Sequence, residues 1–189
     1  MRPPLRQLLL LVTGVLAVGA LGACGNKQDE VTHAETEGAY LDLGGLKYQV
    51  QISRQLNAAD SEDKGYLIGV RPQDRRLPSD QTWYGIFIRV QNTGDDPKRA
   101  AEEFEIRDTQ GNVLRPLELA PDNVFAYRSA RVPGKGLIPG LDSPPAENTI
   151  QGSLLLFKIP YANLQNRPLE FEISDPANPS KKASVALDV

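Results

Sequence analysis

The chain has 189 residues, a formal net charge of −3 and one copy each of cysteine, methionine and histidine. This length allows one domain of ordinary size, and the excess of acidic residues argues against nucleic acid as a partner. Because Cys24, Met1 and His33 are the only residues of their kinds, we expect no disulfide, no cofactor, no metal site and no catalysis by cysteine or histidine.

The first residues have the three parts of an export signal. Arg2 and Arg6 are positive, an uncharged apolar run follows, and small residues precede Cys24. The segment Leu21-Gly22-Ala23-Cys24 resembles the lipobox of bacterial lipoproteins, in which the cysteine thiol receives diacylglycerol before cleavage. The resemblance implies that residues 1–23 are a signal peptide and that Cys24 is lipidated. Two or three acyl chains would then hold the protein firmly on the membrane.

An uncleaved transmembrane anchor is the alternative interpretation of this segment. Residues 8–24 are barely long enough for a membrane span, contain Thr13 and three glycines, and are followed by acidic residues rather than by a stop-transfer cluster. We therefore favour a protein anchored by lipid to the extracytoplasmic face of the cell membrane.

Residues 24–37 are polar and poor in large apolar side chains, which is typical of a flexible tether. His33 lies in this segment, and we expect it to be solvated; a pH-sensing or metal-binding role is the alternative. Residues 38–189 are expected to form the folded domain.

Alternating apolar and polar residues separated by turn residues predict β-strands in this domain. The expected strands are residues 46–52, 83–91, 104–108, 113–114, 153–159, 169–173 and 185–189. In the first of them, Leu46, Tyr48, Val50 and Ile52 share one face. Seven or more short strands of this kind indicate an all-β fold, an antiparallel β-sandwich.

One face of each strand should build the core. Its expected main members are Tyr48, Val50, Ile86, Ile88, Val90, Phe104, Ile106, Leu155, Phe157, Phe171 and Ile173. Trp83 and Phe87 alternate with these residues, so they should point outward or toward a covering loop. Sugar stacking is one interpretation of Trp83, and packing beneath a loop is the favoured one.

Residues 83–94 read WYGIFIRVQNTG, a strand followed by Asn-x-Gly. This segment resembles immunoglobulin-like domains of unknown function in secreted and lipid-anchored bacterial proteins, and residues 104–108, 132–134 and 152–160 fit the same pattern. The resemblance covers residues 47–173. It implies an immunoglobulin-like sandwich outside the cytoplasm, and it brings no established activity and no catalytic residues.

Two acidic segments, residues 57–63 and 92–96, could offer oxygen ligands to calcium. The first lacks the ligand spacing of an EF-hand, and turn chemistry accounts for the second. Basic side chains could bind anionic lipid headgroups or wall polymers, although pairing with nearby acids such as Asp74 is favoured. These basic residues are Arg71, Arg75, Arg76, Arg128, Arg131 and Lys135.

The sequence supports no enzyme. It contains no G-x-S-x-G elbow and no histidine in the expected domain to serve as a base, and no particular pair of carboxylates is indicated for glycoside hydrolysis.

Residues 131–145 contain four prolines and three glycines, so we expect a surface loop that cannot join a sheet. Leu137, Ile138 and Leu141 are nevertheless apolar, and they either fold back over the sandwich or remain exposed for a partner. We therefore predict a non-catalytic binding or interaction module that contacts an envelope protein or polymer. The alternative is a carrier or sensor of a small ligand or cell-wall polymer.

Overall fold

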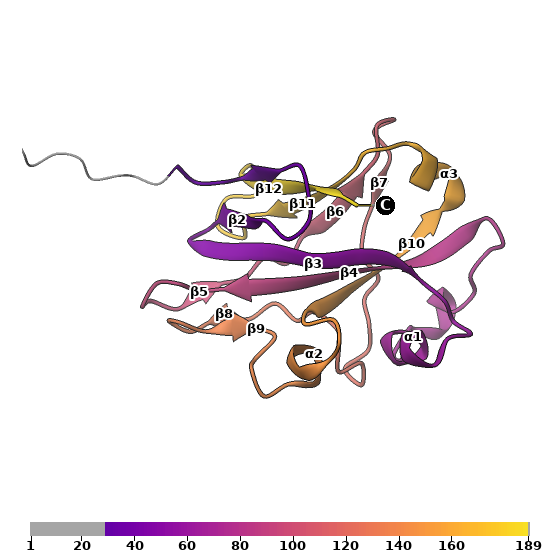
Figure 1. Ribbon diagram of the computed structural model, residues 1–189, viewed down its shortest axis with the longest axis horizontal. Coiled ribbons are helices and arrows are strands. Elements are labelled where there is room, and N and C mark those ends of the chain that lie inside the picture. Colours follow the sequence, from indigo (N-terminus) through magenta and orange to yellow (C-terminus); the bar gives the residue numbers. More distant parts are fainter. Residues whose placement is uncertain (1–28, 189) are drawn as a thin grey trace, which may run out of the picture.

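The computed structural model describes residues 29–188. These residues form an all-β sandwich with a few short helices (Figure 1), which confirms the predicted fold class. The signal peptide, Cys24 and the first residues of the predicted tether lie outside the described residues.

The first sheet contains the C-terminal strands. Its order is β1-β12-β11-β6-β7, and all its neighbours are antiparallel except β1 and β12, which are parallel. The strands are β1 (His33–Ala34), β12 (Lys182–Leu187), β11 (Leu169–Ser174), β6 (Phe104–Arg107) and β7 (Val113–Leu114).

The second sheet contains the two longest strands. Its order is β10-β4-β3-β2, and β9 pairs with the end of β4 beyond β10. The strands are β10 (Ser153–Pro160), β4 (Gln81–Gln91), β3 (Leu46–Leu56), β2 (Tyr40–Leu43) and β9 (Leu137–Ile138). A separate small ladder joins β5 (Lys98–Arg99) to β8 (Arg131–Val132).

The connections interlock the two sheets. Between β4 and its neighbour β10 the chain crosses to the first sheet and forms β6 and β7, and between β6 and its neighbour β11 it returns to form β10. The helices lie in connections: α1 (Ser61–Tyr66), the 3₁₀ turn η1 (Pro72–Asp74), α2 (Pro144–Glu147) and α3 (Tyr161–Gln165).

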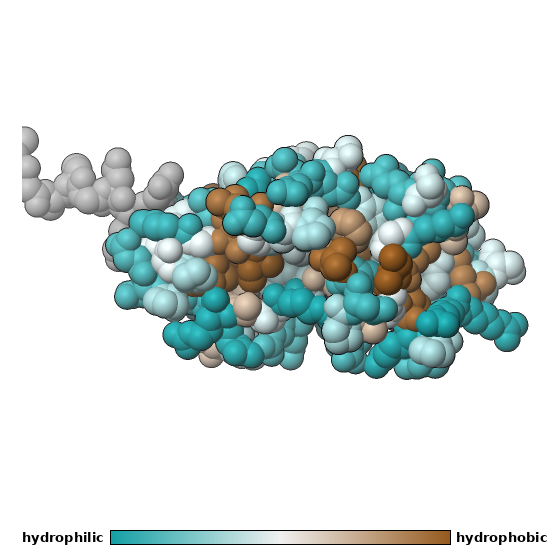
Figure 2. Space-filling model, turned by 90° about the horizontal axis from the view of Figure 1, so that it is seen from below, coloured by the Kyte–Doolittle hydropathy of each residue, from teal (hydrophilic) through white to brown (hydrophobic). Residues whose placement is uncertain are grey.

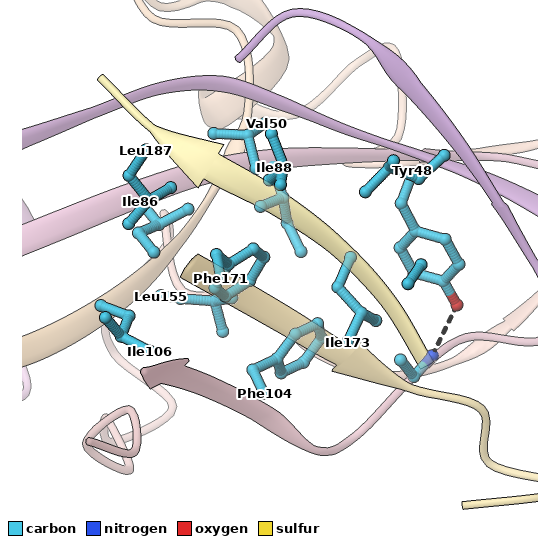
Figure 3. Close-up of a cluster of buried hydrophobic side chains, with 14 of the residues drawn as sticks. Tyr48, Val50, Ile86, Ile88, Phe104, Ile106, Leu155, Phe171, Ile173 and Leu187 are labelled. Atoms are coloured by element: carbon cyan, nitrogen blue, oxygen red, sulfur yellow. Dashed lines mark hydrogen bonds between the residues drawn. The ribbon is translucent and has the colours of Figure 1, made fainter. Parts of the chain in front are cut away.

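The core lies between the sheets, and it contains all eleven residues predicted for it. Figure 3 shows side chains from both sheets meeting there. Phe104 and Phe171 stack with ring centroids 5.8 Å apart, and the Tyr48 hydroxyl accepts a hydrogen bond of 2.9 Å from the Ala101 amide. Each apolar strand face therefore packs against its counterpart, as the alternation predicts.

One predicted strand-face assignment, that of Ile52, is wrong. A bulge in β3 between Val50 and Ile52 shifts the pairing with β4 by one residue, so Ile52 lies opposite Phe87 instead of on the face of Val50. Ile52 is 37% exposed as a result, and Ser53 takes the inward position. A one-residue insertion in a ladder exchanges the faces of all later side chains, and alternation alone does not reveal it.

The other face of the second sheet carries a second apolar cluster. Trp83, Phe87 and Tyr66 belong to it, and segments around α1 and residues 115–127 cover it. Trp83 is 5% exposed, and the Lys158 ammonium lies 5.2 Å from its ring centre. The structure thus confirms packing beneath a covering segment and leaves no open ring face for sugar stacking.

The predicted tether extends too far along the chain. Part of residues 24–37 joins the sandwich, because β1 pairs with β12 and the Asp42 amide donates to the Val31 carbonyl at 2.6 Å. The Glu37 carboxylate accepts from the Ser53 amide at 2.9 Å. His33 is half exposed and contacts the Ser184 hydroxyl at 2.9 Å. The polar composition of this segment does not indicate a strand. β1 forms nevertheless, because its pairing uses backbone groups, which every residue has.

The turn between β6 and β7 depends on a buried carboxylate. Asp108 accepts hydrogen bonds from backbone amides of the turn and from three asparagine side chains, Asn112, Asn163 and Asn166, at 2.8–2.9 Å for the side chains. Burial raises the pKa of Asp108, but these donors outweigh burial and hold it well below its usual range. The carboxylate therefore ties the hairpin to α3 in its charged form.

We expect Asp108→Asn to lower the melting temperature at neutral pH and to flatten its fall in acid. A group with a lowered pKa in the folded state contributes stability that is present above its unfolded pKa, about 3.9, and is lost as the pH falls through the folded value. Melting curves between pH 7 and pH 2 measure this effect. Asp142→Asn, on an exposed loop, is the control and should leave the profile unchanged; an equal acid slope for wild type and Asp108→Asn would contradict the assignment.

Candidate functional site

The predicted partner residues do not lie together on a free loop. Leu137 and Ile138 form β9 and pair with Gln91 and Val90 of β4, and Ile138 packs against the core. The prediction that this segment cannot join a sheet is therefore wrong. β4 extends three residues past its last pair with β10, and the two residues of β9, between Gly136 and Pro139, pair with the last two of these.

The glycines and prolines around β9 make a close backbone junction. Gly134 lies so near residue 95 that an added Cβ would be 2.0 Å from the Asp95 carbonyl oxygen. Asn92 is fully buried and donates to the carbonyls of Asp96 and Val132 at 2.8 and 3.0 Å. The Asn92 side chain, whose oxygen also accepts from the Gly94 amide at 3.0 Å, thus holds segment 92–96, as the turn interpretation predicts.

Beyond Gly140 the segment leaves the sheet, and Leu141 is 70% exposed. Asparagine side chains bind the adjoining loops to α1. Asn148 donates to the Tyr66 hydroxyl at 2.8 Å, and Asn123 donates to the carbonyls of Tyr66 and Ile68 at 2.9 and 2.6 Å. Asn123 and Asn148 therefore tie two loops that are far apart in the sequence to α1, on the surface that carries α1 and α2.

We call this surface the outer face and define it by the exposed side chains of Ile68, Val124 and Leu141. Ile68 is 52% and Val124 57% exposed. Figure 2 views the molecule from the side of α1 and α2 and shows hydrophobic areas between hydrophilic ones. Sequence reasoning found Leu141 and missed the other two residues. In the sequence Ile68 and Val124 are single apolar residues within turn-rich segments. Such a residue can be either exposed or buried, so the pattern does not predict its exposure.

The acidic segment 57–63 is occupied by internal contacts. Asp60 caps α1 by accepting from the amides of Glu62 and Asp63. Asp63 is nearly buried and accepts from two nitrogens of Arg54, at 2.5 and 3.2 Å, and from the Asn57 amide at 2.6 Å. Within residues 29–188 no group of three or more His, Cys, Asp or Glu side chains is arranged to hold a metal ion.

The basic residues do not form one anion-binding cluster. Arg71 contacts Asp74 at 3.3 Å and Glu118 at 2.8 Å, which confirms the favoured pairing. Arg75 donates to the Val70 carbonyl at 3.1 Å, and Lys135 pairs with Asp95 at 3.2 Å. Arg128 donates to the Leu119 and Ala120 carbonyls at 2.9 and 2.6 Å.

A groove of about 260 Å³ opens between the edges of the two sheets. Its apolar lining comes from β6, β10 and the segment that passes between them, and it includes Phe104, Leu117, Leu119, Tyr127, Leu154 and Leu155. The sequence gives no sign of this groove, because the residues that form its walls are far apart along the chain.

No helix within the described range 29–188 has the length and apolar character needed to cross a membrane. No protein-family model and no curated protein sequence matches the chain.

Comparison with solved structures gives resemblances at low identity. They include the yjhA protein from Bacillus subtilis, with a TM-score of 0.47, 10% identity and coverage of 82% of this chain and 99% of that one. A Bacillus subtilis protein described as "a putative lipoprotein (ycdA)" has a TM-score of 0.47 and 11% identity over 82% of this chain. This chain spans 39% of the length of that protein. An uncharacterised β-sandwich protein from Clostridium difficile 630 has a TM-score of 0.42 and 11% identity, covering 82% and 95% of the two chains.

Proposed function

We propose that this chain is a lipid-anchored, non-catalytic binding module on the extracytoplasmic face of the cell membrane. Its outer face would contact a protein or polymer of the envelope. The observation that carries the proposal is the exposure of Ile68, Val124 and Leu141 on loops of the surface where Asn123 and Asn148 bind to α1. Apolar side chains that gather on ordered surface loops mark interaction sites.

The geometry of the anchor supports this assignment. Within residues 29–188 the first backbone contact with the sandwich is at Val31. Val31 lies seven residues after Cys24, so the chain between the lipid and Val31 would span at most about 25 Å. Figure 1 shows that the described chain enters at the end of the molecule opposite α1. An anchored domain would therefore keep α1 at the end away from its lipid.

The test introduces a photo-crosslinking side chain at position 141 in intact cells, and at position 113 as a control. Val113 is 38% exposed and lies on β7, at the edge of the first sheet. We expect discrete crosslinked products from position 141 and none of the same size from position 113. Identical products from the two positions would argue against a specific outer face.

The triple variant Ile68→Ser, Val124→Ser and Leu141→Ser gives a second, independent prediction. Exposed substitutions usually change the free energy of unfolding by less than about 0.5 kcal/mol each, so the melting temperature should stay close to that of wild type. Partner capture by the triple variant should be lost. A large fall in melting temperature would show that these side chains stabilise the fold rather than bind a partner.

A second candidate function is the transport or sensing of a small ligand. The groove between the sheet edges favours it, since ligand sites are concave and combine an apolar lining with a few polar groups. The two functions use different surfaces and can be tested separately.

A further inference from the structure

The groove lies at the open side of the sandwich. On the opposite side the sheets are joined by the hydrogen bond between Asp42 and Val31. On the open side β7 and β10 are edge strands, and the segment 115–129 runs between them. That segment is held to β10, because the Leu117 amide donates to the Leu156 carbonyl at 2.7 Å and the Tyr127 amide to the Leu154 carbonyl at 2.8 Å.

One part of the groove wall is apolar and held in place by contacts with the core. Phe104 of β6 and Leu155 of β10 come from opposite sheets and lie close together in the core (Figure 3), and both also line the groove. The Tyr127 ring meets Phe104 edge to face with centroids 5.1 Å apart, and its hydroxyl donates to the Ala101 carbonyl at 2.8 Å. This arrangement fixes the ring of Tyr127 as one wall.

The charges at the mouth favour an anion. Glu102 forms an ion pair with Arg99, and Glu118 pairs at 2.8 Å with Arg71, which also contacts Asp74 at 3.3 Å. Both acidic residues of the lining thus have a cationic partner, and Glu118 shares its partner with Asp74. Arg128 also lines the groove, and it is held by two carbonyl oxygens. In the part of the chain that the structure describes, no carboxylate forms an ion pair with Arg128. Arg128 therefore has no carboxylate partner of its own beside the apolar part of the groove.

We propose that this groove binds a single-chain anionic amphiphile. Its carboxylate would lie beside Arg128 and its apolar part between Phe104, Tyr127 and Leu155. A volume of about 260 Å³ holds roughly eight to ten carbon atoms, if a methylene occupies about the 30 Å³ of a water molecule in the liquid. This volume is too small for a two-chain lipid. The lipid on Cys24 would not be the occupant, since the chain enters at the joined side of the sandwich.

The proposal rests on the second candidate function, and its test uses the full chain in neutral phosphatidylcholine vesicles. The probe is decanoate carrying a diazirine, and the crosslinked residues are identified by mass spectrometry. We expect saturable labelling of residues 117, 127 and 155. Excess decanoate should compete with the probe, and decyltrimethylammonium should not. Dispersed labelling, or equal competition by the cationic amphiphile, would overturn the proposal.

Variants separate the roles of charge and shape. Arg128→Gln should reduce labelling at low probe concentration at least tenfold, and Arg128→Lys should retain most of it. Arg75→Gln is the matched control, because Arg75 also donates to a backbone carbonyl and lies outside the groove lining. Ala126→Phe, which places a ring at a small lining residue, should abolish labelling.

Melting temperatures show whether these variants fold. Equal loss of labelling in Arg128→Gln and Arg75→Gln, or undiminished labelling of folded Ala126→Phe, would contradict the site. The triple variant of the outer face should label like wild type, so failure of the groove and failure of the outer face are distinguishable.

Discussion

Cys24→Ala is expected to abolish lipid attachment completely and to leave the precursor uncleaved or the protein shed from the membrane. The sulfur is the acceptor of the diacylglycerol group in the lipoprotein pattern that Leu21-Gly22-Ala23-Cys24 resembles, and alanine offers no nucleophile in its place. Without acyl chains the protein would lose about 0.8 kcal/mol of membrane affinity for each methylene no longer buried. Metabolic labelling with an alkyne-bearing fatty acid, followed by cell fractionation, measures both effects.

Thr13→Ala is the control for this experiment, because it changes the apolar run and keeps the cysteine. It should be labelled and fractionated like wild type. Fatty-acid label on Cys24→Ala, or an unlabelled wild-type protein that stays in the membrane fraction, would show that the chain is held by another means, such as the uncleaved segment 8–24.

Phe157→Ala is expected to produce the largest loss of stability among single substitutions in the core. Phe157 is fully buried, lies in the middle of β10 and pairs with Tyr84 of β4. Truncating a buried phenylalanine removes its burial and leaves a cavity, at a cost of about 3–5 kcal/mol. Ile88→Ala, at an equally buried position of β4, should cost about 2–5 kcal/mol. Denaturant unfolding monitored by circular dichroism gives these differences.

Val113→Ala is the matched control, since Val113 lies in a strand and is partly exposed. Its effect should be less than about 0.5 kcal/mol. A denaturation midpoint that barely moves for Phe157→Ala or for Ile88→Ala would mean that the core faces have been assigned to the wrong side of the strands.

Local sequence was sufficient for the strands that pack one face into the core. Side chains in a strand alternate between two faces, so the order of apolar and polar residues reports burial without knowledge of the partner strand. The strands of residues 104–107 and 169–174 were recognised in this way, as were all eleven predicted core residues. The turn at 109–112 is recognisable as well, because glycine, asparagine and aspartate favour turns through the conformation and hydrogen bonds of the adjacent backbone.

Features that depend on distant backbone partners were not predictable from local pattern. β1 and β9 each have two residues, which is too short for an alternating pattern to be recognised. They form because β12 and the end of β4 have unpaired backbone groups at their edges. The bulge in β3 is likewise a property of its pairing with β4. For this reason the polar segment before Gly38 and the Gly/Pro-rich segment 131–145 were both expected to lie outside the sheets.

The candidate sites divide in the same way. The lipidation motif is a contiguous sequence, so it is recognisable without the fold. Leu141 is recognisable as an apolar residue in a segment whose glycines and prolines exclude a central strand. Ile68 and Val124 became part of the outer face only through Asn123, which joins their loops. The groove forms between the edges of two sheets, and its proposed anion site depends on Arg128, which has no carboxylate partner among the described residues. Contacts between residues so far apart in the sequence arise from chain topology, so only the folded structure contains them.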